Sequence, residues 1–316
     1  MRARLFLSGI HARSEELIDC TRSFEKRRLS KGQLNEAFER DTKKLINLQT
    51  KMGFDLISDG MLSWSDPVRP LIECLDGVTM GPYFRWFETN TFYRRPIIID
   101  KPTIRNKMVD SLFYHTNVED YNQLFILPGP YTLSMLSEKN ERDLEQTMLI
   151  YSDALAEVAE RLRINSHSAL VLLEPGLVYE YMRPKECLYS GIFEALNLIC
   201  SKVKQSIVHT FFGDAFKVYK LLANLDSTLI GVDLSETPLR ILSSLKEPNL
   251  AFGILDSLNP LVETPEFLNG YMRKIIRSKL EEVAICPNTD LRFLPREIAD
   301  LKISALGAIK DFMESN

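Results

Sequence analysis

The chain alternates short, continuous apolar runs with longer stretches in which apolar residues recur every three or four positions. Eight of the apolar runs lead directly into a polar residue or a turn. Continuous runs of this length are typical of strands that are buried on both faces. The eight predicted strands cover residues 5–7, 54–57, 124–127, 169–173, 206–208, 229–232, 250–255 and 283–285.

The stretches between these runs predict helices. Residues 141–163 and 296–313 place apolar side chains along one helical face. A strand followed by a helix, repeated about eight times, predicts an α/β fold of the (β/α)₈ TIM barrel type. A doubly wound open sheet is the alternative, but residues 9–12 lack the glycine-rich turn expected after its first strand.

The segment 60–122 is too long to be a simple connection between a strand and a helix. No linker, repeat or low-complexity tract divides the sequence. We therefore expect a single domain over residues 1–316, with a long insertion after the second strand.

Composition narrows the possible functions. The formal net charge is −4, and 45% of the residues are hydrophobic. A net negative charge does not favour binding to nucleic acid or to an acidic membrane. No apolar run approaches the roughly 20 residues of a membrane span. Residues 1–7 begin like a signal peptide, but Ser8, Gly9 and His11 interrupt the apolar stretch, so they are better interpreted as a first strand.

The five cysteines are scattered, and none lies in a C-x-x-C pair. This pattern predicts reduced thiols in the cytoplasm, and argues against a disulfide framework or a zinc ribbon.

Polar residues follow most of the predicted strands. In a barrel, the carboxyl ends of the strands meet at one mouth, where the chemistry of such folds takes place. The alternative for each acidic residue is an ordinary helix cap. Of this set, we expect Glu174, His209, Asp233 and Asp256 to be the acid–base groups. The full set at the strand ends is His11, Asp59, Glu174, His209, Asp233, Asp256, Asn288 and Asp290.

Two segments could bind a ligand. The turn from Gly129 to Thr132 leads into a helix start, whose free N–H groups could receive an anion. Residues 85–95 combine arginines with Trp86 and Tyr93, which suits a planar ligand that carries carboxylates. A solvated loop with aromatic anchors is the plainer alternative, and an RNA-stacking surface has little support from the overall charge. The arginines of this segment are Arg85, Arg94 and Arg95.

The chain resembles the cobalamin-independent methionine synthase family over nearly its whole length. The most specific match is Trp86-Phe87-Glu88-Thr89-Asn90-Thr91-Phe92-Tyr93, which is similar to the W-F-D-T-N-x-x-Y stretch of the family's N-terminal barrel. Further matches are residues 53–60 with Asp66, 127–132, 173–176, Asp256 with 262–266, and 294–297.

The resemblance implies a fold and an activity. Members of this family consist of two fused (β/α)₈ barrels, and some organisms keep barrels as separate chains. The catalytic barrel transfers a methyl group from methyl-tetrahydropteroyl-glutamate to homocysteine, whose thiolate is held on zinc. Carried over to this sequence, the resemblance also implies ligand contacts from Arg13, Asp59, Asp66 and Asn90.

The catalytic barrel's zinc ligands are only partly present. His209 matches the histidine, and Asp233 stands roughly where the glutamate is expected. Phe211 and Thr289 stand at the two cysteine positions. A site without thiolates binds zinc weakly, so we expect no metal and no other cofactor.

Two further positions depart from the catalytic barrel. Leu258 replaces a catalytic histidine, and Leu173 replaces an aspartate that holds the ammonium group of the amino acid. The resemblance therefore points to a stand-alone counterpart of the N-terminal barrel.

Three functions remain open. The first is the partner of a separate zinc-bearing catalytic chain, holding a pterin or amino-acid ligand. The second is a zinc-independent barrel enzyme, either another methyltransferase or a decarboxylase of the uroporphyrinogen type. The third is a binding protein without catalysis, since a shared fold does not guarantee a shared activity.

Overall fold

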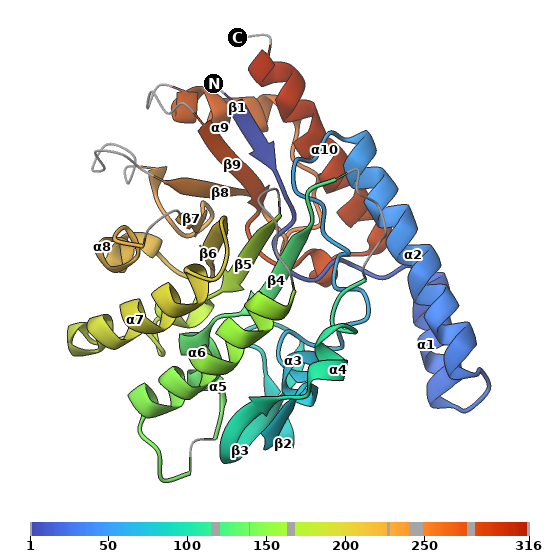
Figure 1. Cartoon of the computed structure of the whole chain (residues 1–316). Coiled ribbons are helices and arrows are strands. Elements are labelled where there is room, and N and C mark those ends of the chain that lie inside the picture. The colour runs from blue at the N-terminus through green and yellow to red at the C-terminus, as the bar shows by residue number, and fades with distance from the viewer. Residues whose placement is uncertain are drawn as a thin grey trace.

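A computed structural model describes residues 2–114, 121–138, 140–162, 168–225, 228–239, 249–276 and 282–314. Its centre is a curled, seven-stranded sheet in the order β1-β9-β8-β7-β6-β5-β4, with every neighbouring pair parallel (Figure 1). The strands are β1 (Arg2–Leu5), β4 (Leu124–Pro128), β5 (Ala169–Leu173), β6 (Ser206–Thr210), β7 (Thr228–Asp233), β8 (Leu250–Leu255) and β9 (Glu282–Pro287). Six of the eight predicted strands are therefore confirmed, and the first lies earlier than predicted, because β1 ends at Leu5 and shares only that residue with the predicted range 5–7.

The predicted second strand, residues 54–57, is not a regular strand. Ile57 makes an isolated parallel bridge to Gln123, and its N–H donates to the carbonyl of Asn122 at 2.8 Å. On the other side, the N–H of Asp55 donates to the carbonyl of Leu5 at 3.0 Å. This segment thus bonds to both edge regions of the sheet. The Asp55 carboxylate also accepts the Leu5 N–H at 2.8 Å, so a side chain replaces a ladder bond there.

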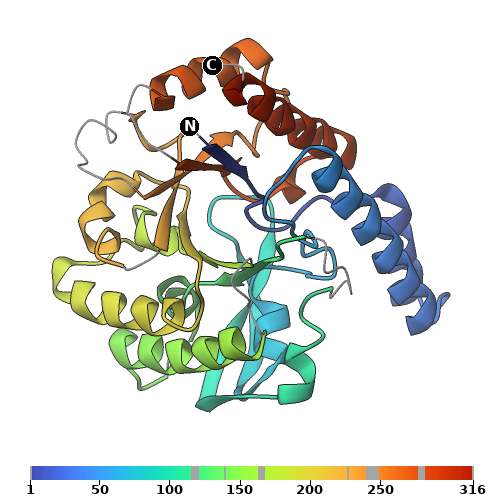
Figure 2. The same ribbon diagram turned by 45° about the horizontal axis from the view of Figure 1, so that its top comes forward.

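Helices cover the outer side of the sheet (Figure 2). The predicted helices at 141–163 and 296–313 are confirmed as α6 and α10, although residue 163 lies outside the described residues. The Asp143 side chain accepts the N–H of Gln146 at 2.7 Å and so fixes the start of α6. The helices are α1 (Glu15–Glu25), α2 (Lys31–Lys51), α3 (Arg69–Glu73), α4 (Asn106–Val109), α5 (Pro130–Leu136), α6 (Leu144–Arg161), α7 (Tyr189–Cys200), α8 (Tyr219–Leu222), α9 (Pro265–Ile276) and α10 (Arg296–Glu314).

The long segment after residue 60 carries a two-stranded antiparallel hairpin of β2 (Leu75–Arg85) and β3 (Phe92–Ile104). The pairing shifts register between Met80 and Tyr83, which marks a bulge. The hairpin also joins the loop after α5, because the N–H of Ile98 donates to the carbonyl of Glu138 at 3.2 Å.

A buried network of charges ties α2, α10 and the end of β1 together. Arg296 donates to Asp300 at 2.8 Å and to Asp41 at 3.0 Å, and the ring of His11 lies 3.0 Å from Asp300. Paired charges of this kind are costly to break, because one partner is left buried alone. The network therefore fixes the segment that follows β1. We call the end of the sheet at which its parallel strands terminate the mouth, and this segment lies there.

The buried apolar residues form one contiguous cluster that runs from β1 to α10. Among the described helices, none has the length and apolar character that crossing a bilayer requires.

Candidate functional site

Glu174, His209 and Asp233 lie next to one another at the mouth, at the ends of three adjacent strands. All three are at most 2% exposed. The carbonyl of Asn288, which follows β9, lies 2.8 Å from His209 Nε2, and the Asn288 side-chain amide donates to Asp233 at 3.2 Å. The structure therefore brings these predicted residues together, with Asn288 as the link between His209 and Asp233.

The His209 ring is held in one tautomer. A carbonyl oxygen can only accept a hydrogen bond, so Nε2 carries the proton toward Asn288. Burial lowers the pKa of His209 to about 4, which keeps the ring neutral. Its Nδ1 is then an acceptor with no hydrogen-bond partner.

Asp233 accepts the N–H of Ser235 at 2.9 Å as well as the Asn288 amide. Burial raises the pKa of Asp233 to about 6, even though these hydrogen bonds favour the ionised form. A carboxyl group with such a pKa can exchange a proton near neutral pH.

Glu174 caps the short helix α5. Its carboxylate accepts the backbone N–H groups of Tyr131 at 2.9 Å and Thr132 at 2.8 Å, and the Thr132 hydroxyl at 2.6 Å. The N–H groups that we expected to receive an external anion are thus occupied by a carboxylate of the same chain. Burial raises the pKa of Glu174 to about 7.

Gly129 makes this arrangement possible. A Cβ atom at that position would overlap the Glu174 side chain. Gly129 and Thr132, which the sequence predicted to bind a ligand, therefore help to position Glu174.

Asp256 does not join the other three. It lines a neighbouring pocket of about 400 Å³, which Glu263, Phe267 and Tyr271 also line. Its carboxylate accepts the N–H of Leu258 at 3.0 Å, and its own N–H donates to Glu263 at 2.8 Å.

The tip of the β2–β3 hairpin, residues 86–91, lies over the mouth. The Phe87 ring lies 5.0 Å from Tyr179 and 5.4 Å from Phe212, which follow β5 and β6. Arg292, which follows β9, donates to the hydroxyl of Thr91 at 3.0 Å. Sequence reasoning did not single out these contacts, because they join residues far apart in the chain.

Two aromatic residues of the expected ligand-binding segment are packed inside the hairpin. Trp86 is fully buried between Phe87 and Tyr93, with ring centroids at 4.9 and 6.1 Å. The Tyr93 hydroxyl donates to the carbonyl of Leu136 at 3.1 Å, and burial raises its pKa to about 12. Both aromatic rings are therefore covered by neighbouring groups. This agrees with the alternative interpretation of the segment, in which Trp86 and Tyr93 anchor a loop and do not stack on a ligand.

The residues Arg85, Asn90 and Arg94 of the same segment differ in their surroundings. The Arg94 guanidinium donates to the carbonyls of Gly81 at 2.9 Å and Met80 at 3.2 Å, which lie at the bulge. Arg85 and Asn90 are exposed. These two side chains are therefore the ones that a ligand above the hairpin could reach.

Three other predicted contacts, Arg13, Asp59 and Asp66, hold backbone groups. Arg13 donates to the carbonyls of Leu62 and Trp64 at 2.7 and 3.0 Å. Asp59 accepts the N–H of Met61 at 2.8 Å, and Asp66 accepts the N–H of Val68 at 2.9 Å. These bonds shape the chain after residue 60.

Unsatisfied polar atoms gather at the mouth. Seven buried side-chain nitrogen or oxygen atoms of the described residues have no hydrogen-bond partner, and six of them belong to residues at strand ends or at the hairpin tip. Two of the six, Asp290 Oδ2 and Arg292 Nε, form an ion pair with each other at 3.2 Å. Buried polar groups are otherwise nearly always bonded, so the remaining four atoms point to a place for water or a ligand. The six residues are His11, Trp86, His209, Thr289, Asp290 and Arg292.

The two positions at which the sequence comparison expects cysteine ligands for zinc carry other side chains. Phe211 fills one expected cysteine position, and its ring packs between His209 at 5.5 Å and Phe212 at 4.8 Å. Thr289 fills the other position with a hydroxyl, and Asp233 is already bonded to Ser235. Zinc sites in proteins are built from cysteine, histidine and carboxylate ligands, and among the residues that the structure describes no group of three such side chains is placed to hold a metal ion.

Comparisons with known proteins agree with this architecture. A family model described as the N-terminal domain of cobalamin-independent synthase matches residues 76–264. The methionine synthase of Saccharolobus solfataricus is 27% identical over 311 residues, which cover 94% of this chain and 91% of that protein. A 5-methyltetrahydropteroyltriglutamate–homocysteine methyltransferase of Streptococcus suis is 29% identical over 166 residues, which cover 50% of this chain but only 22% of that protein.

A solved structure shows the same fold. The B12-independent methionine synthase from Shewanella sp. W3-18-1 superposes with a TM-score of 0.80 at 16% identity, and the match covers 99% of this chain and 97% of that one. The family match spans more than half of the sequence, and it includes the hairpin from residue 76 onward and, at the mouth, Glu174, His209 and Asp233. The chain therefore belongs to the cobalamin-independent methionine synthase family, and it matches the model of that family's N-terminal domain.

Proposed function

We propose that this chain acts in methionine biosynthesis, in methyl transfer from methyl-tetrahydropteroyl-glutamate to homocysteine, as an N-terminal-type barrel beside a separate zinc-bearing catalytic barrel. The observation that carries the proposal is the packing of Phe211 between His209 and Phe212, at a position where a catalytic barrel needs a thiolate.

Chemistry explains why this position matters. A thiol becomes a good nucleophile at neutral pH only when its pKa is lowered, and a zinc ion does this in the catalytic barrel. Phe211 and Thr289 supply no thiolate, so this chain alone would not activate homocysteine. A zinc-bearing partner would supply that step.

The role of this chain in the pair is to hold the pterin donor. Arg85 at the end of β2 and Asn90 at the hairpin tip are exposed, and an arginine fork pairs well with the carboxylates of a glutamate tail. The unsatisfied atoms Trp86 Nε1 and Thr289 Oγ1 offer hydrogen bonds to a polar ring below the tip. We further propose that residues 54–57 close the sheet into a complete barrel, which would hold these groups rigidly.

Reconstitution tests the proposal. Methyl transfer would be measured with this chain alone, with a zinc-bearing catalytic barrel alone, and with both together. We expect no turnover from this chain alone and a clear gain when both are present. Turnover by the isolated chain, or no gain in the mixture, would show that the proposal is wrong.

A second candidate is a zinc-independent enzyme that uses acid–base catalysis. It is favoured by the raised pKa values of Glu174, about 7, and Asp233, about 6, because carboxyl groups with such values can act as acid and base near neutral pH. Turnover of a methyl donor or of a tetrapyrrole carboxylate by the chain alone, abolished by Glu174→Gln, would support this candidate instead.

A further inference from the structure

The pocket that Asp256 lines has no role in the proposed function. Its volume is about 400 Å³, and it lies where the loops that follow β7 and β8 meet the first turns of α9. Phe267 and Tyr271 belong to α9, whereas Ser235 and Asp256 follow the two strands. Most ligand sites have volumes of roughly 300–1,000 Å³, so this space suits a small organic molecule. We call it the α9 pocket.

Two aromatic side chains form one side of the α9 pocket. Phe267 and Tyr271 lie about one helical turn apart, and their ring centroids are 5.1 Å apart with an angle of 75° between the ring planes. The faces of aromatic rings attract cations, and sets of such rings form the cages that bind quaternary ammonium groups. The Lys274 ammonium lies 6.0 Å from the centroid of the Tyr271 ring, so positive charge already approaches this ring.

The two carboxylates that line the α9 pocket differ in their partners. Glu263 forms an ion pair with Lys302 at 2.7 Å, and these side chains are 8% and 0% exposed. The Asp256 carboxylate instead accepts the uncharged N–H of Leu258 at 3.0 Å. No ion pair among the residues that the structure describes includes Asp256. Its negative charge can therefore act on a cation in the pocket.

The ion pair of Glu263 also holds Asp256 in place. The N–H of Asp256 donates to the Glu263 carboxylate at 2.8 Å, on the oxygen that Lys302 does not bind. Lys302 further donates to the carbonyl of Leu261 at 2.7 Å, so a side chain of α10 fixes the end of this loop. A site that is already formed avoids the cost of ordering a loop when a ligand binds.

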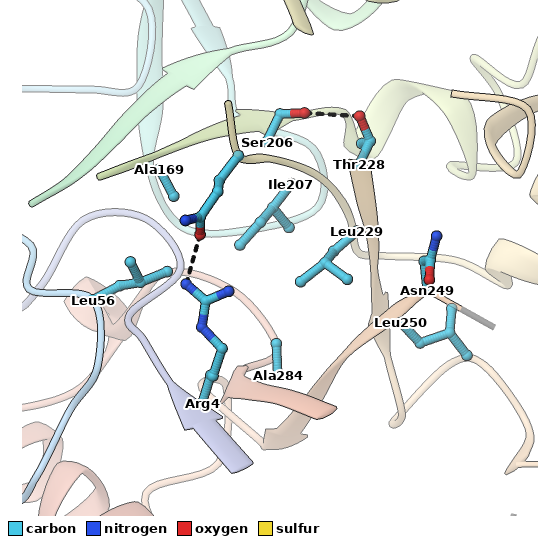
Figure 3. Close-up of a pocket in the computed structure, with 11 residues that line it drawn as sticks. Arg4, Leu56, Ala169, Ser206, Ile207, Thr228, Leu229, Asn249, Leu250 and Ala284 are labelled. Atoms are coloured by element: carbon cyan, nitrogen blue, oxygen red, sulfur yellow. Dashed lines mark hydrogen bonds between the residues drawn. The ribbon is translucent and has the colours of Figure 1, made fainter. Parts of the chain in front are cut away.

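A different cavity, at the opposite end of the sheet, lacks these features. Its volume is about 250 Å³, and it lies where the strands begin, beside the hydroxyls of Ser206 and Thr228, which are 2.7 Å apart (Figure 3). None of the described residues that line it is aromatic or acidic. The combination of aromatic rings with a carboxylate therefore distinguishes the α9 pocket from that cavity.

We propose that the α9 pocket binds a small organic cation, whose positive charge lies between Asp256 and the rings of Phe267 and Tyr271. The apolar part of the ligand lies against Leu234 and Ile254. An anion would be repelled by the Asp256 carboxylate. A neutral molecule of the same shape would gain the apolar contacts alone.

A titration followed by the NMR signals of choline tests this site, because ligand signals report weak as well as tight binding. The control ligand is dimethylbutanol, the isostere of choline in which a carbon atom replaces the charged nitrogen. We expect choline to bind wild type about tenfold more tightly than dimethylbutanol. Asp256→Asn keeps the shape of the side chain and should weaken choline binding by about tenfold, and Phe267→Leu should weaken it several-fold.

Two further variants separate this contact from a general effect of charge. Glu157→Gln removes an exposed carboxylate on α6 and should bind choline as wild type does. Lys274→Met removes positive charge beside Tyr271 and should bind choline at least as tightly as wild type. Melting curves show whether each variant is folded.

The proposal is overturned if choline does not bind wild type, if dimethylbutanol binds equally well, or if Asp256→Asn binds choline as tightly as wild type does. The proposed methyl-transfer role uses neither Asp256 nor Phe267, so failure here would leave that role untouched.

Discussion

The Glu174 carboxylate accepts two hydrogen bonds from Thr132, one from its backbone N–H at 2.8 Å and one from its hydroxyl at 2.6 Å. The hydroxyl of Thr132 also accepts the N–H of Gly176 at 3.0 Å, so it links the end of β5 to the start of α5. A buried carboxyl group in this position is both a helix cap and a group whose charge depends on pH near neutrality.

The first prediction concerns this charge. Burial raises the pKa of Glu174 from 4.5 to about 7, so the folded protein binds more protons than the unfolded chain between these values. The contribution of Glu174 to stability should therefore fall as pH rises from 4.5 to 7. At about 1.4 kcal/mol per pKa unit, the fall is at most ~3 kcal/mol.

Other buried groups also make the stability depend on pH, so the effect of Glu174 has to be measured as a difference between wild type and a variant. Asp233, with its raised pKa, gives a slope of the same sign, whereas His209, with its lowered pKa, loses stability as pH falls from 6.5 to about 4. Chemical unfolding of wild type and Glu174→Gln should be compared across pH, with Glu157→Gln on the exposed face of α6 as control. A wild-type minus Glu174→Gln difference that does not change with pH would contradict the raised pKa.

The second prediction concerns Gly129. Its φ of −78° suits any residue, so alanine there meets no backbone strain. Its Cβ would nevertheless overlap Glu174, and we expect Gly129→Ala to lower the free energy of unfolding by about 1–3 kcal/mol, the usual range for overpacking.

A double-mutant cycle isolates the cause. In a Glu174→Ala background the overlap is gone, so Gly129→Ala should cost clearly less than it does in wild type. Equal costs in the two backgrounds would mean that Gly129 acts through something other than Glu174.

The sequence was sufficient to predict the sheet because its strands are buried on both faces and appear as continuous apolar runs. Residues 54–57 were the exception, because Asp55 replaces a backbone ladder bond with its side chain, which a hydrophobicity pattern does not show. Periodicity predicted the presence of α6 and α10, but α6 begins at Leu144 and not at residue 141, because the Asp143 side chain caps it there.

The site was harder to predict because its roles depend on distant partners. The strand ends correctly indicated that Glu174, His209 and Asp233 would lie close together. No local pattern could show that Glu174 would occupy the N–H groups of α5, or that Asn288 would join His209 to Asp233. Such contacts join residues that are dozens of positions apart, and they exist only once the sheet has formed.

The third prediction concerns metal. Because Phe211 and Thr289 stand at the thiolate positions, purified protein should retain well below one zinc per chain after dialysis, as measured by elemental analysis. The double variant Phe211→Cys/Thr289→Cys should retain more zinc than wild type, since two thiolates would join His209. About one tightly held zinc in wild type would show that the ligands lie elsewhere.

The fourth prediction separates two arginines of the hairpin. Arg94 donates to the carbonyls of Gly81 and Met80, which lie at the bulge, whereas Arg85 is exposed. Arg94→Met should lower the free energy of unfolding by about 1–3 kcal/mol and speed amide exchange in β2, because it leaves these carbonyls without their charged donor. Arg85→Met should leave stability unchanged.

For ligand binding we expect the opposite order of effects, with a larger loss of affinity from Arg85→Met than from Arg94→Met. If the exposed tip holds the glutamate tail of a pterin, Arg85→Met weakens binding of a triglutamate form several-fold and of a monoglutamate form less, because only the longer tail reaches the guanidinium. Calorimetry with both forms measures this difference directly. Arg94→Met, compared under conditions where it is still folded, should bind the two forms as wild type does. If Arg85→Met binds both forms as tightly as wild type, the tail is held elsewhere and Arg85 is a solvated surface residue.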